Sequence, residues 1–136
     1  MVTAEDRKMT KLRVLLVEDN RDAASSMATL MRHFGHEVRV AFDGRSALRE
    51  ASEDEPDVVL LDIGLPGMDG YEVARRLRET LHEKGTLFIV ISGYGTEKDI
   101  LRSKDEGIDL HFVKPADPAE LREELERFAR ARQGNG

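Results

Sequence analysis

Five side chains that could take part in chemistry follow short apolar runs of this 136-residue sequence. They are Glu18, Asp19, Asp62, Ser92 and Lys114. Short apolar runs bounded by Pro, Gly or charged residues are typical of strands buried on both faces of a parallel sheet. In open α/β sheets the ligand site lies beyond the carboxyl ends of the strands, so these side chains are expected to meet there. Taken alone, Asp62 could equally cap the turn after it, since Asp is a common turn residue.

The expected chemistry of this site is phosphoryl transfer assisted by Mg²⁺. Three clustered carboxylates repel one another unless a cation joins them, and Lys114 supplies only one positive charge. Mg²⁺ prefers oxygen ligands and is typically held by one or two carboxylates with a phosphate oxygen. Zn²⁺ would need Cys or paired His, but the chain has no Cys and its four His are not paired at ligand spacing. We therefore expect a carboxylate nucleophile, with Ser92 and Lys114 binding the phosphoryl oxygens.

Five strand patterns alternate with five helix patterns. The expected strands are residues 12–17, 37–41, 58–61, 86–91 and 109–113, and the expected helices start near Asn20, Asp43, Asp69, Thr96 and Asp117. This alternation predicts a parallel sheet with helices on both faces. Residues 37–41 alternate apolar and polar side chains and belong at an edge, which favours an α/β, flavodoxin-like doubly wound sheet in the order 2-1-3-4-5. Glu18 and Asp19 should then approach Asp62, because the first and third strands are neighbours.

The helix after Asn20 is expected to turn one apolar stripe toward the sheet. The stripe consists of Ala23, Met27, Leu30, Met31 and Phe34. Gly35 fits the left-handed position that commonly follows a helix.

Composition limits the possible partners. The net charge is −6, from 27 acidic and 21 basic residues, which argues against a nucleic-acid surface. No segment approaches the ~20 apolar residues of a membrane span, so we expect a cytoplasmic protein without a membrane partner. We predict one domain over residues 11–130, a flexible segment over 1–10 and a flexible tail over 131–136.

These residues resemble the motifs of response-regulator receiver domains of two-component signalling, of the chemotaxis-regulator type. The matching residues are the acidic pair Glu18 and Asp19, the phospho-acceptor Asp62, the hydroxyl residue Ser92, and Lys114 with Pro115. The resemblance spans about residues 11–130. It implies that Asp62 takes a phosphoryl group from a histidine kinase or a histidine phosphotransfer protein. The chain would be a signalling phospho-acceptor and not an enzyme, catalysing only its own phosphorylation and dephosphorylation.

The resemblance also implies roles for the surrounding residues. Asp19, Asp62 and the backbone carbonyl of Gly64, with Glu18 acting through water, would hold Mg²⁺. Lys114 would pair with Asp62 and then with the phosphoryl group, aimed inward by a cis bond before Pro115. Ser92 would hydrogen-bond the phosphoryl group and move toward it. A face formed by helix four, strand five and helix five would then contact a separate downstream protein or support a weak dimer of an otherwise monomeric chain.

Two residues depart from the family pattern. His111 stands where the family has a switching Tyr or Phe, and Phe112 has the wrong strand parity to replace that ring. We weigh two interpretations of His111, a surface residue without a switching role or a modest ring switch, and favour the first. Tyr94 could shield the acyl phosphate from water, whereas Gly64 offers neither a shield nor a group that positions water.

Three other functions are less consistent with the sequence. An FMN or nucleotide binder would need a Gly/Ser/Thr-rich phosphate loop where this chain has Glu18 and Asp19. A haloacid-dehalogenase-like phosphatase would need a second Asp at the position of Gly64. The remaining alternative is a degenerate receiver that acts as an interaction adaptor independently of phosphorylation.

Overall fold

The computed structural model describes residues 11–62, 70–81, 85–93 and 107–134. Its elements are β1 (Arg13–Val17), α2 (Arg21–His33), β2 (Glu37–Ala41), α3 (Gly44–Glu53), β3 (Val58–Asp62), α4 (Gly70–Leu81), β4 (Leu87–Ser92), β5 (Leu110–Val113) and α6 (Pro118–Gly134). Four of the five expected helices lie within these ranges, and the helix expected from Thr96 lies outside the described residues. The segment 1–10, the expected cap Asp69 and the expected site residues Gly64 and Tyr94 also lie outside them.

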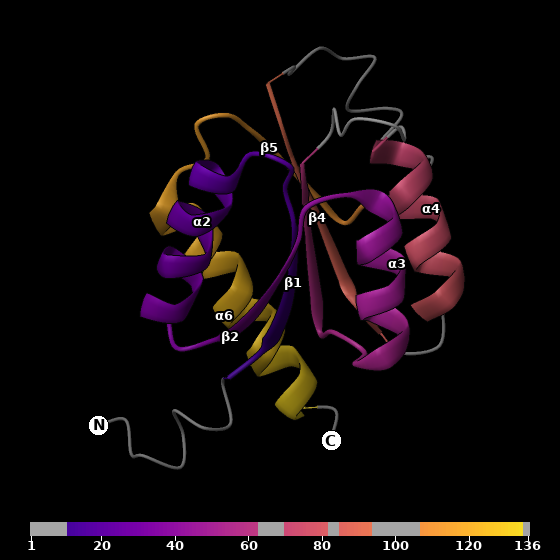
Figure 1. Ribbon diagram of the computed structural model, residues 1–136. Coiled ribbons are helices and arrows are strands. Elements are labelled where there is room, and N and C mark those ends of the chain that lie inside the picture. Colours follow the sequence, from indigo (N-terminus) through magenta and orange to yellow (C-terminus); the bar gives the residue numbers. More distant parts are fainter. Residues whose placement is uncertain (1–10, 63–69, 82–84, 94–106, 135–136) are drawn as a thin grey trace.

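The five described strands form one parallel sheet in the order β2-β1-β3-β4-β5. The predicted α/β fold, its strand order and the edge position of β2 are therefore confirmed. Figure 1 shows α2 and α6 on one side of the sheet and α3 and α4 on the other. Within the described part of the chain, no helix combines the length and apolarity that crossing a membrane requires.

Alternate residues of the central strands pack into two apolar cores, one on each face of the sheet. In β3, Val59 and Leu61 pack with residues of α3 and α4, whereas Val58 and Leu60 pack with residues of α2 and α6. Because both faces are covered, the strand interiors are apolar throughout, and polar side chains gather at the strand ends. This packing fixes the position of Asp62 at the carboxyl end of β3.

The cap of α2 agrees with the sequence, but the buried face of this helix is rotated by one residue. The Asn20 side chain accepts a hydrogen bond from the backbone N–H of Ala23, and Gly35 follows the helix with a φ of +98°. Ala23 is exposed, however, which corrects the expected stripe. The side chains that α2 buries fully are those of Ala24, Ala28 and Met31, while Met27, Leu30 and Phe34 are partly buried. Alanine adds little to the apolar pattern, so tertiary packing decides which alanine faces the core.

The last helix extends into the segment 131–136 that was expected to be a flexible tail. Asp117 caps its start through a 2.9 Å hydrogen bond from the N–H of Ala119, and the helix continues to Gly134. Near its end, an Arg132 guanidinium nitrogen lies 2.8 Å from an Asp57 carboxylate oxygen, and the guanidinium carbon lies 5.5 Å from the centre of the Phe128 ring. The ion pair with Asp57 ties the last turn to the body of the domain.

Gly107, which leads the chain into β5, is a site where a methyl group should be costly. Its φ is +78°, and a Cβ added there would meet the guanidinium of Arg78 on α4. We expect Gly107→Ala to lower the free energy of unfolding, measured by urea denaturation, by about 1–3 kcal/mol. Gly35→Ala is the matched control, because its φ is also positive but no described atom lies within 4 Å of its added Cβ. If both variants lose the same free energy of unfolding, the contact with Arg78 adds no cost beyond that of the positive φ.

Candidate functional site

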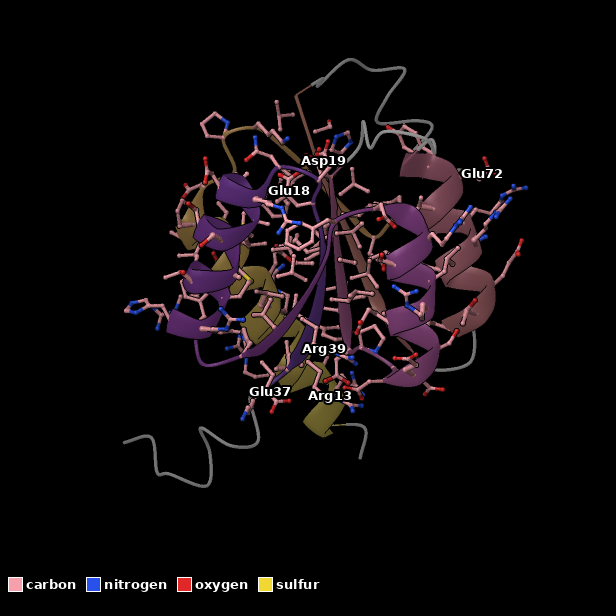
Figure 2. The ribbon with its side chains drawn as sticks, viewed as in Figure 1. Arg13, Glu18, Asp19, Glu37, Arg39 and Glu72 are labelled. Atoms are coloured by element: carbon pink, nitrogen blue, oxygen red, sulfur yellow. The ribbon has the colours of Figure 1, made fainter. Side chains whose placement is uncertain are left out.

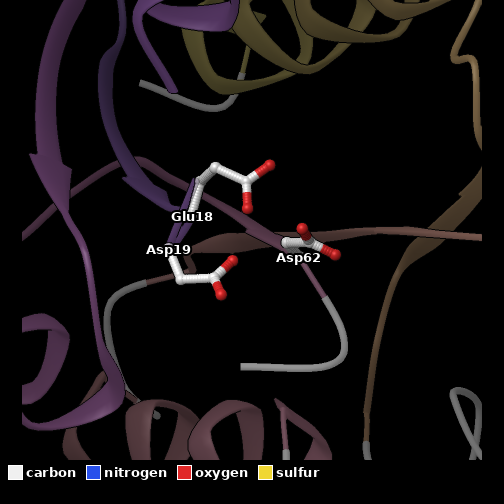
Figure 3. A group of neighbouring side chains, drawn as sticks. All are labelled: Glu18, Asp19 and Asp62. Atoms are coloured by element: carbon white, nitrogen blue, oxygen red, sulfur yellow. The ribbon is translucent and has the colours of Figure 1, made fainter. Parts of the chain in front are cut away.

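Three carboxylates converge at the carboxyl ends of β1 and β3. Val17 of β1 pairs with Leu61 of β3, so the residues that follow each strand are brought side by side. Figure 3 shows the side chains of Glu18, Asp19 and Asp62 around one small space. One oxygen from each lies within 4.8 Å of the others, and all three carboxylates belong to the described residues. The predicted approach of Glu18 and Asp19 to Asp62 is confirmed.

Glu18 is the carboxylate with the most perturbed environment. It is 8% exposed, and its Oε2 atom is buried without a hydrogen-bond partner among the described residues. Burial, followed by the proximity of the Asp62 and Asp19 carboxylates, raises the pKa of Glu18 from 4.5 to about 8. At neutral pH the cluster therefore favours a proton or a cation. A divalent cation with oxygen ligands fits this donor set, since it offsets the charge and satisfies the buried oxygen.

Lys114 reaches the same space from the end of β5. Its Nζ atom lies 2.8 Å from the Oδ2 of Asp62, as the resemblance implies. Burial alone would lower the pKa of Lys114, but the hydrogen bond and charge of Asp62, with the charges of Glu18 and Asp19, outweigh it and raise the pKa. The Lys114–Pro115 bond is cis, as expected. The lysine is thus a permanent cation that orients Asp62.

Ser92 and His111 contact each other beside this cluster. Ser92 is 1% exposed, and its Oγ lies 2.7 Å from the Nε2 of His111. His111 is partly buried, between the exposed surface and the core. Whether His111 takes part in switching stays a prediction. The expected strand order places the two residues on adjoining strands with His111 facing Ser92, and the register of β4 and β5 brings them into direct contact.

Charged residues at the opposite end of the sheet pair among themselves. Figure 2 shows Arg13, Glu37 and Arg39 at the far end from Glu18 and Asp19. Arg13 lies 2.9 Å from Asp54, and Arg39 contacts both Glu50 and Asp54. These ion pairs link β1, β2 and α3, and we assign them a structural role.

A mostly apolar cavity of about 610 Å³ opens next to Asp62 and Lys114, on the side of the sheet covered by α2. Its walls include Leu16, Met27, Leu60 and Ile91, together with Pro115 and Ala116. From the sequence, these apolar residues are expected only to form part of the core. Their clustering beside the charged site depends on how α2 packs and could not be read from the sequence.

A doubly wound parallel sheet with three carboxylates and a paired lysine at its carboxyl edge defines a class of α/β proteins with an acidic site at the topological switch point. Residues 14–126 match the response regulator receiver domain, and the chain belongs to this family. It is thus a receiver domain of the kind used in two-component signalling, which confirms the resemblance inferred from the motifs.

Several relatives are similar over most of this chain. It is 35% identical to the transcriptional regulatory protein PrrA of Mycobacterium tuberculosis, over 93% of this chain and 54% of that protein, so it spans about half the length of this relative. It is 30% identical to the sporulation initiation phosphotransferase F of Bacillus subtilis, over 88% of this chain and 95% of that protein.

The structural neighbours agree with this assignment. A CheY-like receiver domain protein from Methanospirillum hungatei superposes with a TM-score of 0.82 at 25% identity, over 91% of this chain and 98% of that one. The receiver domain of a sensor histidine kinase from Pseudomonas aeruginosa, with a magnesium ion coordinated in its active-site cleft, gives 0.78 at 28% identity, over 88% and 98%.

Proposed function

We propose that Asp62 accepts a phosphoryl group from a phosphohistidine on a histidine kinase or a histidine phosphotransfer protein. The observation that carries this proposal is the 2.8 Å contact between Asp62 and Lys114 inside the Glu18–Asp19–Asp62 cluster. An Asp62 oxygen would attack phosphorus and form an acyl phosphate while the P–N bond to the histidine breaks. Lys114 would pair first with the Asp62 carboxylate and then with the negatively charged phosphoryl oxygens.

The cluster would hold Mg²⁺ during this reaction. Asp19 and Asp62 would be direct ligands and Glu18 a ligand through water, together with the backbone carbonyl of Gly64, which lies outside the described residues. The buried Oε2 of Glu18 and the raised pKa of this residue support a cation at this position. When bound, Mg²⁺ would offset the negative charge of the carboxylates and of the incoming phosphoryl group.

Transfer of the signal would use the edge of the sheet that β5 forms. The expected output face includes β5 and α6, and Val113 of β5 is 47% exposed. We propose that this face contacts a separate downstream protein, with the chain a monomer or a weak dimer. The similarity to a Bacillus phosphotransferase supports phosphotransfer over the alternative of a phosphorylation-independent adaptor. The intact Asp62–Lys114 pair supports it further.

Asp19→Ala tests the metal site. Loss of one carboxylate should weaken Mg²⁺ binding about tenfold or more, as measured by calorimetry, and slow labelling by acetyl phosphate in parallel. Asp22→Ala is the matched control, because Asp22 is an exposed carboxylate in the first turn of α2, only three residues away in sequence. It should leave both quantities near their wild-type values. Unchanged Mg²⁺ affinity in Asp19→Ala would contradict the assignment.

A further inference from the structure

His111 and Ser92 are diagonal neighbours on one face of the sheet. In the register of β4 and β5, His111 lies beside Val90 and Val113 lies beside Ser92. Diagonal side chains on adjacent strands are within reach of one another when one of them is long. Here the imidazole reaches the hydroxyl at 2.7 Å, and Ser92 is almost inaccessible to bulk water. The strand pairing therefore brings the two side chains within reach of each other.

The direction of this hydrogen bond decides what Ser92 can do. A hydroxyl and a ring nitrogen at this distance can bond either way. If Ser92 donates its proton to Nε2, that proton is not available to a phosphoryl oxygen. If the Nε2–H of His111 donates to Oγ, Ser92 keeps its proton for another acceptor. A phosphoryl group is an anion that only accepts, so its presence favours the second arrangement.

We propose that His111 is a positioning residue for the phosphorylated state. Its Nε2–H donates to the Oγ of Ser92, and the Ser92 hydroxyl donates to an oxygen of the phosphoryl group on Asp62. This inference rests on the proposed function. Two consecutive hydrogen bonds in a water-poor setting polarise one another, so the imidazole strengthens Ser92 as a donor. A phenylalanine ring, which the family has at this position in other members, provides no such donor.

Two substitutions at His111 separate hydrogen bonding from ring packing. His111→Gln keeps an N–H donor near the position of Nε2, whereas His111→Leu keeps an apolar side chain and removes the donor. The probe is beryllofluoride with Mg²⁺, an analogue of the phosphoryl group, titrated by NMR. Val113→Ala is the matched control, because Val113 is on the same strand and face but is 47% exposed. Circular dichroism checks that each variant folds.

We expect His111→Leu to weaken beryllofluoride binding about five- to tenfold, the scale of one hydrogen bond in a polar network. His111→Gln should stay within about twofold of wild type because it retains the donor. In a Ser92→Ala background, His111→Leu should have no further effect, since the imidazole acts through the hydroxyl. Long-range ¹H–¹⁵N spectra of the analogue-bound wild-type protein should show a proton on Nε2.

Each contrary result has a distinct meaning. Unchanged binding in His111→Leu, the same loss in both Ser92 backgrounds, or a bare Nε2 with the proton on Nδ1 would each overturn the positioning role alone. Failure of the wild-type chain to bind beryllofluoride and to be labelled by acetyl phosphate would overturn the proposed function, and this inference with it. The wild-type measurement therefore comes first and separates the two failures.

Discussion

Asp62→Asn should abolish phosphorylation of this chain. The substitution keeps the shape of the side chain and an oxygen that can accept a hydrogen bond from Lys114, which lies 2.8 Å from Asp62 in the wild-type structure. An amide oxygen is not a competent nucleophile toward phosphorus, so no acyl phosphate can form at this position. Incubation with acetyl phosphate and Mg²⁺, followed by intact-protein mass spectrometry, should show one added phosphoryl group in wild type and none in the variant. The wild-type label should be removed by hydroxylamine, as expected for an acyl phosphate.

Asp117→Asn is the control for this experiment. Asp117 follows Lys114 and Pro115 and caps α6, and Asn is an equally good capping residue, so the fold should be kept. Labelling of this variant should match wild type. A hydroxylamine-sensitive label at the wild-type level in Asp62→Asn would mean that another carboxylate is the acceptor, with Asp19 and Glu18 the other candidates in the cluster.

Glu18→Gln should stabilise the metal-free protein at alkaline pH while weakening Mg²⁺ binding. The folded state raises the pKa of Glu18 from 4.5 to about 8, so the folded protein binds this proton more tightly than the unfolded chain. The proton on Glu18 therefore stabilises the folded state. This stabilisation is fully present below the pKa that Glu18 has in the unfolded chain, and it is lost as pH rises through the pKa that Glu18 has in the folded protein. Above about pH 8 the wild-type protein must bury the charged carboxylate beside Asp62 and Asp19. An uncharged amide relieves this repulsion by about 1–3 kcal/mol.

Urea denaturation in EDTA at about pH 5 and about pH 9 measures this effect through the free energy of unfolding. Wild type should lose stability between the two pH values more steeply than Glu18→Gln does. Adding Mg²⁺ at the higher pH should reverse the order, because the cation stabilises the wild-type cluster more than the variant. Glu53→Gln, the same substitution at an exposed position of α3, should retain the wild-type slope. If the free energy of unfolding changes with pH equally in wild type and in Glu18→Gln, Glu18 is not the group responsible for the pH dependence.

The sequence by itself was sufficient to predict the sheet and the position of the acidic site at its carboxyl edge. Helices cover both faces of the sheet, so Val58–Leu61 are all buried. A strand of this kind appears in the sequence as a continuous apolar run. Helix caps such as Asn20 and Asp43 act within three residues, so their signals are also local. Once the order of the strands was inferred, topology brought Glu18 and Asp19 to Asp62, because the ends of neighbouring parallel strands share one edge.

Tertiary structure decided what depends on contacts between distant residues. The last turns of α6 are held by the ion pair between Arg132 and Asp57, which are 75 residues apart. No local sequence pattern predicts such a pair. Residues 23 and 24 are both alanine, so the sequence does not distinguish them. The rotation of α2 against the sheet decides that Ala24 is the buried one. The contact between Ser92 and His111 depends on the register of β4 and β5 and on the length of the imidazole side chain. Sequence periodicity reports which face of an element is apolar, whereas the partner of each polar atom is set only when the elements pack together.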